Sequence, residues 1–103
     1  MSKATVGDFI VDRLQQWGID RVFGYSGDGI NGVMSALRRN DGVTLVQPRH
    51  EELAAFMACG HAKYSGRPGA VVTTSGPGAI HALNGLYDAA KDHMPVVAVV
   101  GQQ

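Results

Sequence analysis

The sequence lacks the features that mark disulfide-rich, membrane-spanning and nucleic-acid-binding proteins. A single cysteine, Cys59, excludes an internal disulfide framework and suits a reducing compartment. The chain has nine basic residues (lysine plus arginine) and nine acidic residues (aspartate plus glutamate). It therefore lacks the excess of positive charge that is typical of proteins that bind nucleic acid or an anionic membrane. Apolar runs are too short to cross a bilayer, and MSKATVGDF lacks the apolar core of a signal peptide. We therefore expect one cytoplasmic, globular domain.

What the sequence has instead is a regular alternation of helical and strand patterns. Residues 5–18 have the apolar spacing of a helix, in which Thr5 and Asp8 can form the N-terminal cap and Gly18 suits the end. The apolar positions of this helix are Val6, Phe9, Ile10, Leu14 and Trp17. Further helices are expected at 29–39, at 51–64 and within 75–93, and strands at 21–25, 43–46, 70–74 and 96–101.

This order of elements predicts an α/β fold. The strands at 70–74 and 96–101 are continuous aliphatic runs, as expected when helices cover both faces of a parallel sheet. We predict an open parallel sheet with helices on both faces, in three layers, with a flavodoxin-like strand order. The strand at 96–101 either forms an uncovered edge or is followed by more chain, and we favour a domain that is incomplete at its C-terminus.

Ligands of such sheets bind beyond the carboxyl ends of the strands. Four segments leave those ends, namely YSGDG, QPRHE, TSGPGA and GQQ. The second carries the ionisable groups and places Glu51 at the start of a helix. A carboxylate in the first turn is favoured by the helix dipole by about 0.3–1 kcal/mol, so a structural role is open to Glu51 as it is to Glu52.

The other motifs are weak. SGDGING has neither the spacing G-x-G-x-x-G nor a G-K-[ST] sequence, so it favours a plain glycine turn. SGPG could offer N–H groups to an anion or form a rigid helix entry. The histidines and Cys59 show no compact ligand spacing, so we predict no metal site in this chain. Cys59 is expected in the core, and His61, His81 and His93 at the surface or the edge of the core.

Three segments carry a resemblance to a known family. RVFGYSGDGINGVMSAL, PRHEELAAFMACGHAKYSGRPGAVVTTSGPGAIHALNGLYDA and DHMPVVAVVGQ resemble the N-terminal pyrimidine-binding domain of thiamine-diphosphate-dependent enzymes. The branch is the one that contains pyruvate oxidase, acetolactate synthase and related 2-keto acid decarboxylases. The resemblance implies that residues 1–103 are part of this domain, and that the middle domain and the domain that binds diphosphate and Mg²⁺ are absent. The GDG triplet at 27–29 has the wrong spacing for the family's Mg²⁺ motif, so we interpret it as a coincidence.

The resemblance also implies roles for individual residues. Glu51 matches the glutamate that hydrogen-bonds N1′ of the cofactor's aminopyrimidine ring and so promotes loss of the C2 proton. Burial is expected to raise its pKa above the usual value of about 4.3. Gly27 matches a glycine near the reaction centre, although Ser26 stands where proline is frequent, and Gln102 matches a glutamine on the substrate side. The loop that shapes the pyrimidine pocket is matched by Gly76, Pro77 and Gly78.

For the full-length relative, the resemblance implies a homodimer or homotetramer that acts on a 2-keto acid such as pyruvate. The implied cofactors are thiamine diphosphate and Mg²⁺, with FAD as a further option. This chain alone is expected to supply the pyrimidine side without catalysing the reaction. Two alternatives stay open, a truncated product that only binds a partner chain and a stand-alone regulatory domain. The regulatory domain would need a phosphoacceptor at a strand end, where Asp28 is the one candidate.

Overall fold

The computed structural model describes residues 4–25, 27 and 30–101. Each predicted helix and strand is present, with its ends shifted by at most a few residues. The elements are α1 (Val6–Gln16), β1 (Arg21–Gly24), α2 (Asn31–Arg39), β2 (Thr44–Val46), α3 (Glu51–Ser65), β3 (Gly69–Thr73), α4 (Pro77–Lys91) and β4 (Val96–Val100). Within the described ranges, every helix is too short or too polar to span a bilayer.

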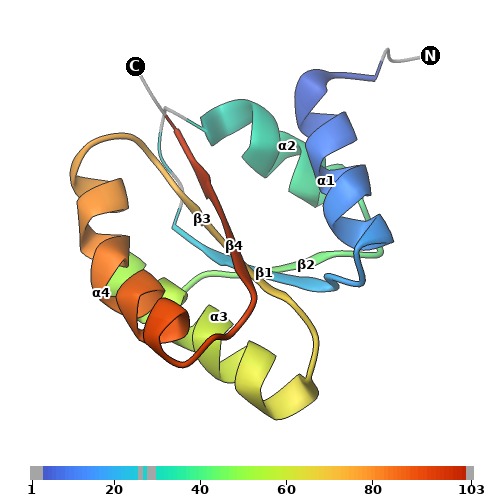
Figure 1. The fold of residues 1–103 in the computed structure, drawn as a ribbon. Helices are drawn as coiled ribbons and strands as arrows, with labels where there is room; N and C mark the ends of the chain where they lie inside the picture. Colours follow the sequence, from blue (N-terminus) through green and yellow to red (C-terminus); the bar gives the residue numbers. More distant parts are fainter. Residues whose placement is uncertain (1–3, 26, 28–29, 102–103) are drawn as a thin grey trace.

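The four strands form one parallel sheet in the order β2-β1-β3-β4. Helices α1 and α2 lie on one face and α3 and α4 on the other (Figure 1). Alternate side chains of the strands point to opposite faces, so Val22 and Val72 join the core under α1 and α2, whereas Phe23 and Val71 join the core under α3 and α4. The predicted three-layer α/β fold with a flavodoxin-like order is confirmed.

Helix α1 begins as predicted, but the face that it buries is only partly the predicted one, because Leu14 is buried as expected and Ile10 packs against the core. The side chain of Thr5 accepts a hydrogen bond from the Asp8 N–H, and the Asp8 side chain accepts one from the Thr5 N–H. Phe9 and Trp17, however, are 59% and 57% exposed. The buried positions are Gly7, Val11 and Leu14. The reason is close helix packing, because a Cβ on Gly7 would lie 2.5 Å from the carbonyl oxygen of Gly32 near the start of α2.

Small residues let α3 and α4 approach each other closely. Gly85 in α4 faces Ala55 in α3, and a Cβ on Gly85 would lie 2.4 Å from the Ala55 Cβ. Cys59 is 1% exposed, as predicted for a core residue. The buried residues of α3 are Ala54, Ala55, Ala58, Cys59 and Ala62. This packing fixes the first turns of the two helices relative to each other.

Strand β4 forms an edge of the sheet and is only partly buried, which is compatible with both alternatives left open for it, an uncovered edge and a strand followed by more chain. Val97 and Val99 pack against the core under α1 and α2. Ala98 is exposed, and Val100 is 45% exposed. A continuous apolar run predicts a strand, but how far it is covered depends on the segments packed on either side of it.

Candidate functional site

Three of the predicted loops meet at the carboxyl edge of the sheet, around Thr74. A Cβ built on Gly27, in the loop after β1, would lie 2.5 Å from the Thr74 Cβ. One built on Gly78, in the first turn of α4, would lie 3.0 Å from Thr74 Cγ2 and 3.3 Å from Glu51 Oε2. Glycine is therefore the residue that permits these approaches. The structure thus brings Gly27, Gly78 and Glu51 together.

The α3–α4 side of this edge is completed by the turn that starts α4. Gly76 has a φ of 65°, which favours glycine, and Pro77 occupies the first turn of the helix, where its missing N–H costs nothing. Gln102, predicted on the substrate side, lies outside the described residues. Ser26 and Asp28 also lie outside them.

Glu51 is the first residue of α3, and its side chain is 14% exposed. Its Oε1 atom lies 3.2 Å from Nδ1 of His81, a histidine in the second turn of α4. The carboxylate is therefore largely shielded from water, but it already has a partner. Local sequence patterns do not predict this partner, because the two residues are 30 positions apart.

The pKa of Glu51 is lowered from its usual 4.5, so the predicted increase is wrong for this chain. Burial is the largest single influence and does raise the pKa, as expected. It is outweighed by the hydrogen bond from the residue's own backbone N–H, the hydrogen bond from His81 and the positive potential of His81 and His50. Glu51 is thus an ionised hydrogen-bond acceptor in this chain near neutrality.

The residues beside Glu51 tie α3 to α4. His50 is the N-terminal cap of α3, and its Nδ1 accepts a hydrogen bond of 3.1 Å from the Glu52 N–H. The rings of His50 and His81 lie 4.4 Å apart, centroid to centroid. Glu52 accepts a hydrogen bond of 2.7 Å from Nδ2 of Asn84, which fits the structural role left open for it. The two adjacent glutamates therefore have different partners on α4.

Three potential metal ligands also meet here. One nitrogen each of His50 and His81 and one oxygen of Glu51 lie within 4.8 Å of one another. Sequence spacing does not predict this group, because His81 is remote from His50 and Glu51 along the chain; its one signal is its place just after a strand-end loop. What such a group binds depends on its protonation. It can hold protons, attract an anion through protonated imidazole, or bind a metal cation through neutral imidazole and carboxylate.

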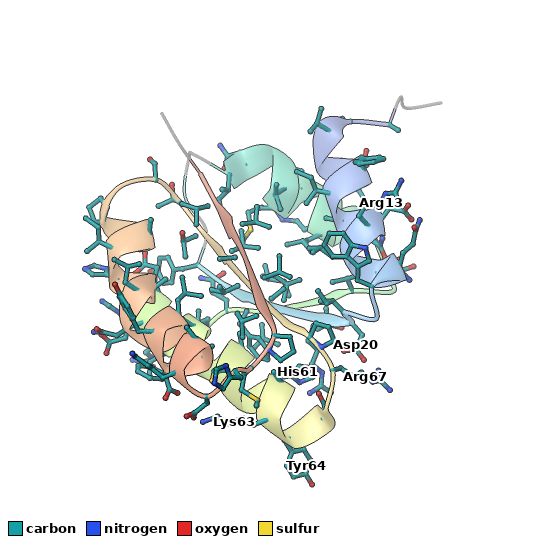
Figure 2. All side chains as sticks on the ribbon, viewed as in Figure 1. Arg13, Asp20, His61, Lys63, Tyr64 and Arg67 are labelled. Carbon is teal, nitrogen blue, oxygen red and sulfur yellow. The ribbon has the colours of Figure 1, made fainter. Side chains whose placement is uncertain are left out.

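A second charged group lies at the opposite end of the sheet. Figure 2 shows Asp20, His61 and Arg67 near one another, and Asp20 immediately precedes β1. The nearest nitrogens of His61 and Arg67 are 4.0 and 3.7 Å from the Asp20 carboxylate oxygens. Both separations are long, and Asp20 and Arg67 are more than half exposed, so these pairs contribute little to stability. The amino ends of strands are also not where open sheets bind ligands. We therefore place the candidate site at Glu51.

Comparison with known proteins gives a consistent result. The family model "Thiamine pyrophosphate enzyme, N-terminal TPP binding domain" matches residues 4–103. A putative thiamine pyrophosphate-containing protein, YdaP, of Bacillus subtilis (strain 168) is 46% identical over 99% of this chain and 18% of its own length. Pyruvate oxidase of Lactiplantibacillus plantarum is 42% identical over 93% of this chain and 16% of its own length. The chloroplastic acetolactate synthase of Arabidopsis thaliana is 42% identical over 92% of this chain and 14% of its own length. The chain thus spans less than a fifth of the length of each of these relatives.

Proposed function

We propose, on the premise that the chain belongs to the thiamine pyrophosphate enzymes as their N-terminal TPP binding domain, that Glu51 binds the aminopyrimidine ring of thiamine pyrophosphate, also called thiamine diphosphate. The observation that carries this proposal is the position of its carboxylate. It lies at the carboxyl edge of a parallel sheet, 14% exposed, beside a glycine turn that leaves open space.

The residues around Glu51 suit a flat, nitrogen-containing ring. Gly27, Gly76 and Gly78 keep side-chain atoms away from the edge of the sheet, where any Cβ at Gly27 or Gly78 would crowd Thr74. The open space is beside Gly76, and a ring placed there could have the Glu51 oxygen as its polar contact. We assign Gly27, Gly76, Pro77 and Gly78 to the wall of the pyrimidine pocket and Gln102 to the substrate side.

When bound, thiamine diphosphate supplies a weakly acidic C2–H group whose loss makes the cofactor reactive. The task of Glu51 is to hold and share a proton with ring nitrogen N1′. This task requires the pKa of Glu51 to be higher than in the free chain. A bound ring would exclude water and so strengthen the effect of burial, and a Glu51 carboxylate that held the ring would have a weaker contact with His81, so both changes would raise the pKa of Glu51.

For the whole protein to which this domain corresponds, we propose decarboxylation of, or acyl transfer from, a 2-keto acid such as pyruvate. The names of the relatives, pyruvate oxidase and acetolactate synthase, support this substrate class. Residues 1–103 would then form part of the pyrimidine domain. Mg²⁺, any FAD and the oligomeric contacts would depend on further domains, because this chain matches less than a fifth of each of those two relatives.

The test exchanges Glu51 for Gln in the complete enzyme that carries this domain. The amide keeps a hydrogen bond but cannot share a proton, so exchange of the cofactor C2 proton with deuterium should slow by about 10²–10⁴-fold. Glu52→Gln is the matched control, because its amide oxygen can still accept the hydrogen bond from Asn84. Unchanged exchange in Glu51→Gln, or equal slowing in both variants, would remove Glu51 from the mechanism.

A further inference from the structure

We propose that His50, Glu51 and His81 form a binding site for a divalent transition-metal ion of the zinc class in the chain without bound cofactor. This inference stands on the three side chains alone and does not depend on the proposed function. It also revises the expectation, drawn from sequence spacing, that the chain has no metal site.

One distance among the three residues is close to the value that zinc requires, and the other two lie within reach of a side-chain movement. Zinc binds nitrogen and oxygen ligands at about 2.0–2.2 Å in a tetrahedron, which places neighbouring ligand atoms about 3.3–3.5 Å apart. Glu51 Oε1 and His81 Nδ1 are 3.2 Å apart. The third ligand, from His50, is within 4.8 Å of both. It has to move inward by roughly 1.5 Å at most, which a side-chain rotation can supply.

The chemistry of the ligands selects the class of metal. Two imidazoles and one carboxylate bind zinc and similar ions, and they leave a fourth position for water. Magnesium prefers oxygen ligands and retains its waters, so this group should discriminate against it. His50 and His81 are both exposed, which means that an ion can reach the site without any opening of the fold. The shielded carboxylate of Glu51 supplies the negative charge.

Metal binding has a specific consequence for the start of α3. In the free chain, Nδ1 of His50 accepts the hydrogen bond from the Glu52 N–H. If Nδ1 binds the metal, its lone pair is no longer available to that N–H. If Nε2 binds instead, the neutral ring carries its proton on Nδ1, which then cannot accept. Either way the contact is lost, so the Glu52 amide reports on occupancy of the site.

The experiment is a calorimetric titration of the 103-residue chain with Zn²⁺, and with Mg²⁺ for comparison. We expect one Zn²⁺ per chain and much weaker or no binding of Mg²⁺. His50→Gln and His81→Asn should each weaken Zn²⁺ binding by more than about tenfold, since even groups that only orient zinc ligands contribute about 10–100-fold. His93→Asn is the matched control, because His93 is exposed and its positive φ of 56° is tolerated by asparagine.

A measurement on the unchanged chain covers the case in which a variant does not fold. In NMR spectra, Zn²⁺ should shift the ring signals of His50 and His81 and the amide signal of Glu52, and leave the ring of His93 unaffected. The proposal is overturned if these signals do not respond to Zn²⁺. It is equally overturned if both site variants bind Zn²⁺ as tightly as the original chain, or if His93→Asn weakens binding as much as they do.

Discussion

At the scale of single residues, the state of Glu51 is decided by two histidines that face it. Burial alone would favour the protonated carboxyl group, and burial is the strongest single influence. The hydrogen bond from His81 and the positive potential of both rings act in the opposite direction and, with the backbone N–H, prevail. A prediction from burial alone therefore had the right cause but the wrong sign for this chain.

We predict that Glu51 titrates below 4.5 in the free chain and that His81→Asn raises its pKa. Asparagine removes the positive charge while most of the burial remains. NMR titration of the Glu51 side-chain carbonyl measures both values, with His93→Asn as the control that should leave the pKa unchanged. A Glu51 that titrates above 4.5 in the unchanged chain would contradict the structure.

The same pKa shift predicts how the stability of the chain depends on pH. Because the pKa of Glu51 is lower in the folded chain than the usual 4.5, ionised Glu51 stabilises the fold above about pH 4.5. This contribution is lost as the pH falls through the lowered pKa. We therefore expect Glu51→Gln to be less stable than the original chain at pH 7 and the difference to disappear at more acidic pH, measured by urea unfolding at several pH values. If the stability difference between the two chains grew toward acidic pH, the pKa of Glu51 would be raised in the folded chain and not lowered.

At the scale of elements, the positions of the helices depend both on local sequence signals and on close packing. The capping pair Thr5 and Asp8 starts α1 where the sequence predicted. The contact between Gly85 and Ala55 sets how closely α3 and α4 lie, and so where Glu51 meets His81. The first effect can be read from neighbouring residues, whereas the second requires knowledge of the packed pair.

Thr5→Ala should destabilise the chain by about 0.5–2 kcal/mol, because the Asp8 N–H loses its side-chain acceptor. Thr5→Ser keeps the hydroxyl oxygen and should stay close to the original stability. Urea unfolding of the three chains provides the comparison. Equal losses in both variants would show that the cap hydrogen bond is not the cause.

Two glycine-to-alanine changes should have opposite effects. Gly85→Ala places a methyl group 2.4 Å from the Ala55 Cβ and should cost about 1–3 kcal/mol. Gly60, in the interior of α3, has no atom within 4 Å of an added Cβ, so Gly60→Ala should stabilise the helix by about 0.5–1 kcal/mol. Thermal or urea unfolding measures both, and adding Ala55→Gly to Gly85→Ala should recover part of the loss. Similar effects at both positions would argue against close packing as the cause.

At the scale of the whole molecule, the sheet has two unequal edges. Strand β2 is short, and its Thr44 is exposed. Strand β4 at the other edge is the fully apolar sequence VVAVV, with exposed positions at Ala98 and Val100. It lies beside an apolar groove to which Phe9 and Trp17 of α1 contribute. An uncharged edge strand of this kind is a template for pairing with another chain.

We predict that the 103-residue chain associates with itself as its concentration rises, and that Ala98→Lys reduces this association. A charge on the edge strand opposes pairing and the burial of apolar side chains. Sedimentation velocity over a range of concentrations measures the effect. Thr44→Lys, at the opposite edge, is the matched control and should leave the association unchanged. Equal effects of the two substitutions would exclude β4 as the pairing edge.

The sequence by itself determined the order of helices and strands, the parallel sheet and the place of Glu51 at its carboxyl edge. These features follow from local signals, namely apolar spacing, capping pairs, glycine turns and aliphatic runs. Only the tertiary structure decided which face of α1 is buried, how far β4 is covered, and that His50 and His81 flank Glu51. The physical reason is that exposure and pKa depend on atoms brought close by packing, and for Glu51 the decisive partner is 30 residues away along the chain.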